Sequence, residues 1–330
     1  MTNVVPIAIG YGFRLVCYKQ ATNVLNYIKR YKNAQIPKPK YLSIFIFNST
    51  KMKSLNIISV LFFSIMILSC NPTDNTTQTG HKDFSIGEIV EFYSDVLKED
   101  RTINIYLPQG YSPGSLKAYP VIYLLDGSAD EDFIHVSGLV QFASFPWIQI
   151  MPETIVVGIS NIDRKKDFTY PSNSERDQKE FPTTGGSENF IKFIETELQP
   201  FITKNYKTTT TKTLIGQSLG GLLATEILLK KPELFDNYII VSPSLWWDEE
   251  ALLDYKSKSY TTSKSIYVAV GKEGEVMERV ANELYEKVNV EKASGTKTYF
   301  NFLEKRDHGD VLHLAAYDAF EKIFKKEASE

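Results

Sequence analysis

The segment TLIGQSLGGLLA, residues Thr213–Ala224, contains a single serine, Ser218, in the pattern Gly-x-Ser-x-Gly. A β-prone run, residues 211–215, leads directly to this serine, and residues 219–230 have the composition of a helix. Strand, tight turn and helix in this order are typical of a nucleophile elbow, the strained turn that exposes a catalytic serine. Because the short pattern also occurs by chance, the rest of the chain must supply the base, the acid and the sheet that such a serine needs.

Apolar runs of strand length alternate with longer amphipathic stretches after residue 86. This alternation predicts an α/β fold with a mostly parallel central sheet of about eight strands and helices on both faces. The expected strands are residues 89–93, 102–107, 121–125, 154–159, 213–215, 238–241, 265–270 and 298–302, and the expected helices are residues 188–206, 219–230, 275–290 and 311–326. Residues 161–186 are expected to form a long connection over the carboxyl edge of the sheet.

The base should follow the serine, because enzymes with this elbow have the chain order nucleophile, acid, histidine. Of the four histidines only His308 and His313 lie after Ser218. His308 lies in a polar, glycine-containing loop between the last strand and the last helix, whereas His313 falls inside that helix. We therefore predict His308 as the base.

The acid is expected in the stretch GKEGE, which follows the strand at residues 265–270. Glu273 lies in the loop itself and is preferred. Glu275 is the alternative, although a carboxylate in the first turn of a helix is also favoured for capping alone. Asp248, Asp307 and Asp310 are weaker candidates. For the oxyanion, the backbone N–H of Leu219 is expected to act with that of Ser128 or Gly127 in the turn after the third strand.

Several stretches resemble the esterase branch of the α/β-hydrolases, which includes siderophore (enterobactin and salmochelin type) esterases, feruloyl esterases, S-formylglutathione hydrolases and mycolyltransferases. The stretches are RTINIYLPQGY, YPVIYLLDG, IVVGISNIDRKKDFTY, LIGQSLGGLLA, PELFDNYIIVSPSLWW and DHGDVLH, spread over residues 84–324. The siderophore esterases look most similar. The resemblance implies an α/β-hydrolase fold, with Ser218 as nucleophile, His308 as base and Glu273 as acid. The sequence departs from the family pattern at two places: a glycine separates the two glutamates Glu273 and Glu275, and Asp310 follows the glycine of HGD.

The resemblance also suggests a substrate wall on loops at the carboxyl edge of the sheet, where α/β folds place their ligands. Its candidates are Arg164, Asp167, Trp246 and Trp247, because the aromatic rings could stack on an aryl or acyl group. The alternative is that the two tryptophans are packing residues and that Arg164 forms a structural ion pair.

The N-terminal residues have a different character. Met52 and two flanking lysines precede an apolar run, residues 55–69, which ends at Cys70. Residues 52–70 thus resemble a bacterial lipoprotein signal peptide, which predicts lipidation at Cys70 and a polar tether over residues 71–83. The protein is then expected to be lipid-anchored in the cell envelope, and the outer membrane is the preferred location. Residues 1–51 are expected to be an extension upstream of the true start, with a genuine basic extension as the alternative. Residues 84–330 would be the catalytic domain.

Charge and cysteine content exclude some classes of function. Nine of the 37 basic residues and none of the 40 acidic residues lie in residues 1–70, so the remaining chain has 28 basic residues and a net charge of −12. Such an acidic chain argues against a nucleic-acid partner. Cys17 and Cys70 are the only cysteines, which argues against thiol chemistry or a cysteine-based metal site after Cys70.

Together these features predict a membrane-anchored serine esterase that hydrolyses a carboxylic ester, either a small-molecule siderophore or a carbohydrate (glycan) ester, and that needs no metal or cofactor. An acyltransferase of the same fold and a non-catalytic, lipid-anchored binding protein are the alternatives.

Overall fold

The computed structural model describes residues 80–325, and residues His81–Glu330 form one compact unit. The predictions for residues 1–70, and the tether up to residue 79, lie outside the described residues. Within them, no helix is long and apolar enough to cross a membrane.

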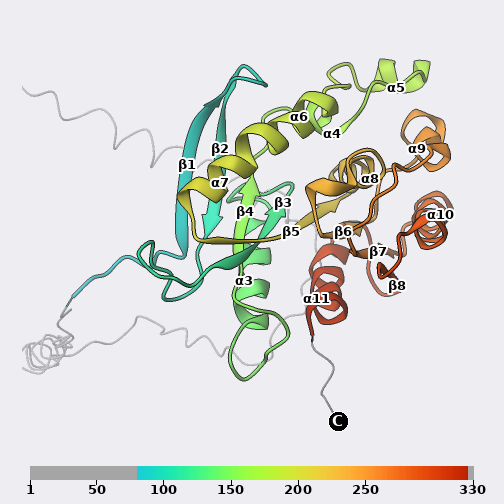
Figure 1. Ribbon diagram of the computed structural model, residues 1–330. Coiled ribbons are helices and arrows are strands. Elements are labelled where there is room, and N and C mark those ends of the chain that lie inside the picture. The colour runs from blue at the N-terminus through green and yellow to red at the C-terminus, as the bar shows by residue number, and fades with distance from the viewer. Residues whose placement is uncertain (1–79, 326–330) are drawn as a thin grey trace, which may run out of the picture. The chain divides into compact units, whose positions relative to one another are not determined.

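An eight-stranded sheet forms the centre of the fold, in the order β1-β2-β4-β3-β5-β6-β7-β8 (Figure 1). The strands are β1 (Gly87–Ser94), β2 (Glu99–Tyr106), β3 (Tyr119–Leu124), β4 (Ile155–Ile159), β5 (Thr208–Gln217), β6 (Asn237–Val241), β7 (Ser265–Gly271) and β8 (Lys297–Leu303). β1 and β2, and β2 and β4, pair antiparallel, and all the other neighbours pair parallel. The predicted α/β-hydrolase architecture is confirmed.

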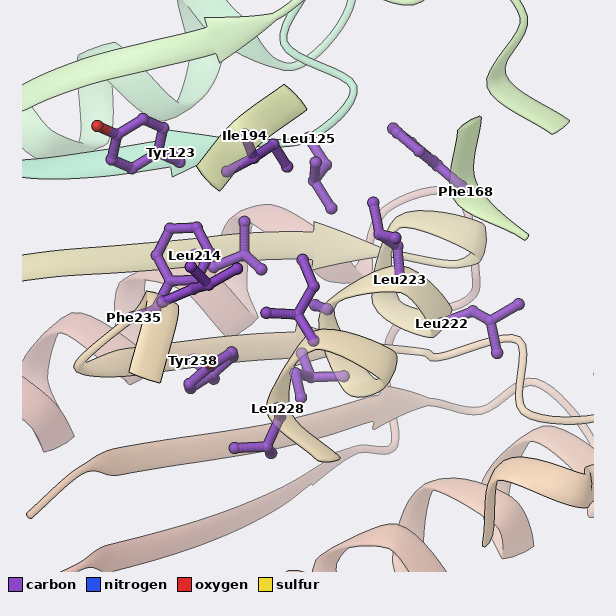
Figure 2. Close-up of a cluster of buried hydrophobic side chains, with 14 of the residues drawn as sticks. Tyr123, Leu125, Phe168, Ile194, Leu214, Leu222, Leu223, Leu228, Phe235 and Tyr238 are labelled. Atoms are coloured by element: carbon purple, nitrogen blue, oxygen red, sulfur yellow. The ribbon is translucent and has the colours of Figure 1, made fainter. Parts of the chain in front are cut away.

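Helices cover both faces of the sheet, as expected for strands that are apolar on both sides. One face packs against α6 (Ser187–Phe193), η1 (Ile194–Leu198), α7 (Gln199–Asn205), α8 (Leu219–Lys230) and α10 (Glu275–Glu291). The other packs against α3 (Phe133–Ala143) and α11 (Val311–Phe324). Figure 2 shows part of the first hydrophobic cluster, in which Leu222 and Leu228 of α8 accompany Leu214 of β5.

Three details differ from the expected helices. The helix expected over residues 188–206 contains the π-helical turn η1, which is followed by Pro200 in α7. A wider turn accommodates a proline that has no N–H to donate. Residues 161–186 contain two short helices, α4 (Arg164–Phe168) and α5 (Glu175–Glu180). α3 is not predicted at all, because its sequence FIHVSGLVQFA has no polar stripe to mark it as an amphipathic helix.

Candidate active site

Ser218 occupies the sharp turn between β5 and α8, as the elbow pattern predicts. Its backbone has φ 58° and ψ −120°, a strained conformation for a residue with a side chain. The turn requires glycine at residue 216, because a Cβ there would lie 2.3 Å from the carbonyl oxygen of Gly220. Hydrogen bonds from the Ser218 amide to the Val241 carbonyl (3.0 Å) and from the Ser244 amide to the Ser218 carbonyl (3.0 Å) hold the turn on the neighbouring strand.

His308 lies in the loop between β8 and α11, and its ring contacts Glu273. The Nδ1 atom of His308 is 2.5 Å from Oε2 of Glu273. A second link joins this loop to the elbow, since the Gln217 side-chain amide donates to the carbonyl of His308 at 2.6 Å. The base candidate is thus held on one side by the acid candidate and on the other by the residue that precedes the serine.

Glu273 is almost fully buried, with 2% of its side chain exposed. Its other oxygen, Oε1, accepts hydrogen bonds from the Ser242 hydroxyl (2.5 Å) and the Gly271 amide (2.9 Å). Burial by itself would raise the pKa of this carboxyl, but the hydrogen bonds from His308, Ser242 and Gly271 outweigh it and hold the pKa below its ordinary value. The site therefore keeps Glu273 ionised beside the imidazole.

Glu275 is exposed at the start of α10 and does not contact His308. The loop between the two glutamates is fixed by Glu278, whose Oε1 accepts from the amides of Glu273 (3.0 Å) and Gly274 (2.9 Å). Gly274 has a φ of 92°, a backbone conformation that residues with a side chain rarely adopt. Of the acids considered from the sequence, Glu273 is the one whose carboxylate contacts the His308 ring among the described residues.

A cavity of about 420 Å³ opens beside the elbow and has both Ser218 and His308 in its wall. The remaining lining residues are Asp126, Glu131, Asp132, Arg164 and Gln217. Among the described residues, the hydroxyl of Ser218 forms a hydrogen bond with the hydroxyl of Ser244, and the two Oγ atoms are 3.4 Å apart. Ser218 and His308 thus face the same space, which can accommodate an ester.

Arg164 is the one candidate of the substrate wall that lines the cavity, and it also forms an ion pair. Its Nε atom donates to Oδ1 of Asp126 (2.6 Å), and a terminal nitrogen donates to Oδ2 (2.9 Å). Asn161 donates to the same Oδ1 at 2.7 Å. This bidentate pair orients the guanidinium at the edge of the cavity.

The other three wall candidates are not among the lining residues. Asp167 is buried and accepts from buried Arg101 at 2.9 Å. Trp247 is buried and donates its Nε1–H to the carbonyl of Tyr170 at 2.9 Å. Trp246 packs its half-buried ring against Trp247, with centroids 6.2 Å apart. Both tryptophans thus make the packing contacts of the alternative interpretation, and Asp167 pairs with a buried arginine. A role of these three residues in substrate binding stays a prediction.

The acidic wall of the cavity was missed in the sequence. Asp126, Glu131 and Asp132 lie in the run DGSADED, which is separated from the end of β3 by one residue. This position at the end of a parallel strand was the available signal. Burial, reinforced by the charges of Asp126 and Glu131 and opposed by Arg164, raises the pKa of Asp132 to about 6.

The structure distinguishes the two residues considered for the second oxyanion donor. The Gly127 amide donates to the Ile159 carbonyl at 3.0 Å and is therefore occupied. Within residues 80–325 no acceptor receives the Ser128 amide. Leu219 is the first residue of α8, where backbone N–H groups lack partners within the helix. Among the same residues, no group of three or more His, Cys, Asp or Glu could hold a metal ion.

A family model described as "Putative esterase" matches residues 94–310, which contain the elbow, the glutamate and the histidine loop. The chain belongs to this esterase family. The ferri-bacillibactin esterase BesA of Bacillus subtilis is 30% identical over 263 residues, which are 73% of this chain and 91% of that protein.

Solved structures agree with this assignment. The BES protein of Bacillus cereus superimposes with a TM-score of 0.64 at 30% identity, over 75% of this chain and 98% of its own. An IroE-like serine hydrolase of Shewanella oneidensis superimposes with a TM-score of 0.63 at 30% identity, over 72% of this chain and 80% of its own. The chain is thus a carboxylic ester hydrolase of the α/β-hydrolase fold.

Proposed function

We propose that the chain hydrolyses esters through a catalytic triad of Ser218, His308 and Glu273. The observation that carries the proposal is the contact between His308 and buried Glu273, with Ser218 and His308 in the wall of one cavity. A carboxylate on Nδ1 orients the imidazole and stabilises its protonated form, which leaves Nε2 to accept the serine proton.

The reaction follows from these positions. Ser218 Oγ attacks the ester carbonyl as His308 Nε2 takes its proton, and the amides of Leu219 and Ser128 stabilise the oxyanion that develops. His308 then gives the proton to the leaving alcohol, and an acyl-enzyme remains on Ser218. Water attacks this acyl group with His308 again as base, and the carboxylic acid leaves while Ser218 regains its proton.

The test is the Ser218→Ala variant. Removal of the nucleophile should lower kcat for p-nitrophenyl butyrate by at least about 10⁴-fold, with an unchanged circular dichroism spectrum. Retention of wild-type turnover in the folded variant would disprove the role of Ser218.

For the natural substrate we propose the ester bonds of a siderophore. Support comes from the relatives, since BesA is described as a ferri-bacillibactin esterase. Mass spectrometry of bacillibactin and enterobactin, iron-free and ferric, after incubation with the wild type and Ser218→Ala is the direct test. Cleavage of acetylated or feruloylated glycans, with both siderophores left intact, would contradict this substrate class.

We also propose that Cys70 carries a lipid that anchors the domain in the cell envelope. The support is the sequence: an apolar run, residues 55–69, ends at this cysteine, and a polar stretch follows. Metabolic labelling with a fatty acid should mark the wild-type chain and not Cys70→Ser. Equal labelling of both chains would disprove the site.

A further inference from the structure

An aromatic patch lies where α3, the loop after it and α11 meet. It consists of Phe142, Phe145, Trp147 and Tyr317. The rings of Phe145 and Trp147 are stacked with centroids 4.7 Å apart, and Phe142 contacts Phe145 at 6.1 Å and Tyr317 at 6.3 Å. Trp147 is nevertheless 74% exposed and Phe142 is 42% exposed. The rings therefore form an ordered surface that is open to solvent.

Three of the four patch residues belong to a long stretch of the chain that contains no charged residue. Residues 133–152, which span α3 and the following loop, contain no Asp, Glu, Lys or Arg. The same helices expose Ile134 of α3 and Leu314 of α11. An exposed aromatic surface beside such an uncharged stretch marks an interaction site, and here it belongs to a chain whose net charge after Cys70 is −12.

The length of the chain between Cys70 and the folded domain indicates which binding partner would lie close to the patch. Ten residues separate Cys70 from His81, at which the compact unit begins. A segment of ten residues spans at most about 35 Å. With a lipid on Cys70, the domain would stay within this distance of a bilayer, and even a weak contact would then be populated.

We propose that the aromatic patch docks on the surface of a lipid bilayer. Trp, Tyr and Phe have an apolar body suited to the boundary between headgroups and acyl chains, and Trp is enriched at that depth. The absence of charge in residues 133–152 removes the cost of bringing acidic groups to anionic headgroups. The acidic remainder of the domain would face water.

Docking through this patch would also orient the active site. α3 and α11 lie side by side on one face of the sheet (Figure 1), with His135 near His313 and Phe142 near Tyr317. The two helices therefore run in the same direction, and both begin beside the cavity, just after Asp132 and His308. The patch lies near the far end of α3, about 16 Å along its 11 residues. A docked domain would hold the cavity about one helix length above the bilayer.

The test uses residues His81–Glu330, the compact unit, so that the apolar run and Cys70 cannot contribute. An N-terminal hexahistidine tag tethers this chain to phosphatidylcholine vesicles that contain a nickel-chelating lipid, with or without bromine on the acyl chains. Bromine should quench part of the tryptophan emission of the wild type, and Trp147→Phe should lose that quenched component, since Trp246 and Trp247 lie away from the patch. Phe142→Ser should reduce the quenching at least twofold.

Tyr255→Ser is the matched control, because Tyr255 is 41% exposed but follows α9 (Ala251–Asp254), which packs on the other face of the sheet. It should leave the quenching unchanged. Absence of bromine-dependent quenching in the tethered wild type would overturn the proposal. The proposal would also be overturned if the tryptophan emission changed without vesicles and sedimentation showed a dimer that Trp147→Ser abolishes. That result would assign the patch to contact with a second copy of the chain. Hydrolysis of p-nitrophenyl butyrate in solution should be equal in all these variants, so a failure of the patch is separable from a failure of the proposed triad.

Discussion

The Nδ1 atom of His308 lies 2.5 Å from Oε2 of Glu273, and these two residues are brought together from loops 35 positions apart in the chain. The glutamate is buried and accepts two further hydrogen bonds, whereas the histidine is half exposed at the cavity. A buried acceptor thus orients a ring that borders the cavity. Such an arrangement predicts that the acid matters through orientation and charge.

Replacement of the acid should therefore lower turnover with the fold intact. We expect Glu273→Gln to reduce kcat for p-nitrophenyl butyrate by roughly 10³- to 10⁴-fold, because the amide no longer holds the imidazole in the required tautomer or stabilises its charge. Glu275→Gln is the control and should keep kcat within about twofold, because Glu275 is exposed at the start of α10 and does not contact His308. Comparable losses in both variants would contradict the assignment of Glu273.

The glycine of the elbow should be intolerant of a side chain. In Gly216→Ala the new Cβ would meet the Gly220 carbonyl oxygen at 2.3 Å, and the turn must shift. We expect a loss of about 1–3 kcal/mol in the free energy of unfolding and a lower kcat. The matched variant is Gly138→Ala in α3, where a Cβ meets nothing within 4 Å. This variant should gain up to about 1 kcal/mol, and urea denaturation measures both.

The pair formed by Arg101 and Asp167 should matter for stability rather than for turnover. Both side chains are buried, so Asp167→Ala removes a buried carboxylate and leaves the Arg101 guanidinium with the more exposed Glu99, at 2.8 Å, as its remaining carboxylate partner among the described residues. The change should cost about 1.5–3 kcal/mol in the free energy of unfolding. Glu180→Ala breaks an exposed ion pair with Arg176 and should cost at most about 0.5 kcal/mol. Similar losses in the two variants would show that burial does not govern the strength of the pair.

Asp132 should make stability depend on pH. Its pKa is raised to about 6 from 3.8, so the folded state binds this proton more tightly than the unfolded state does. The favourable contribution is complete below about pH 4 and is lost as the pH rises through 6. Asp132→Asn should therefore increase the free energy of unfolding at pH 8 relative to the wild type, by about 1 kcal/mol after allowance for partial solvation. Urea denaturation at pH 8 and pH 3.5 tests the sign, because the gain should vanish at the lower pH. A gain of equal size at both values would assign the effect to something other than titration.

Much of the site could be predicted because its signals are local. The order of strand, turn and helix around Ser218 depends on backbone propensity and on the small residues at 216 and 220, all within one short segment. His308 could be selected by chain order and by its position in a loop. Both signals can be read from residues that are close together in the chain or from their order along it.

The sequence by itself thus determined the α/β alternation, the eight strands and the serine at the turn, because hydrophobic periodicity and turn residues act over a few positions. Only the tertiary structure decided that Glu273 reaches His308, that Asp167 neutralises Arg101 66 positions away, and that Asp126 holds Arg164 at the cavity. The physical reason is that each of these contacts joins ionisable groups from loops, strands or helices that are far apart in the chain. Their partners are selected by how the strands are ordered in the sheet and by which groups become buried together.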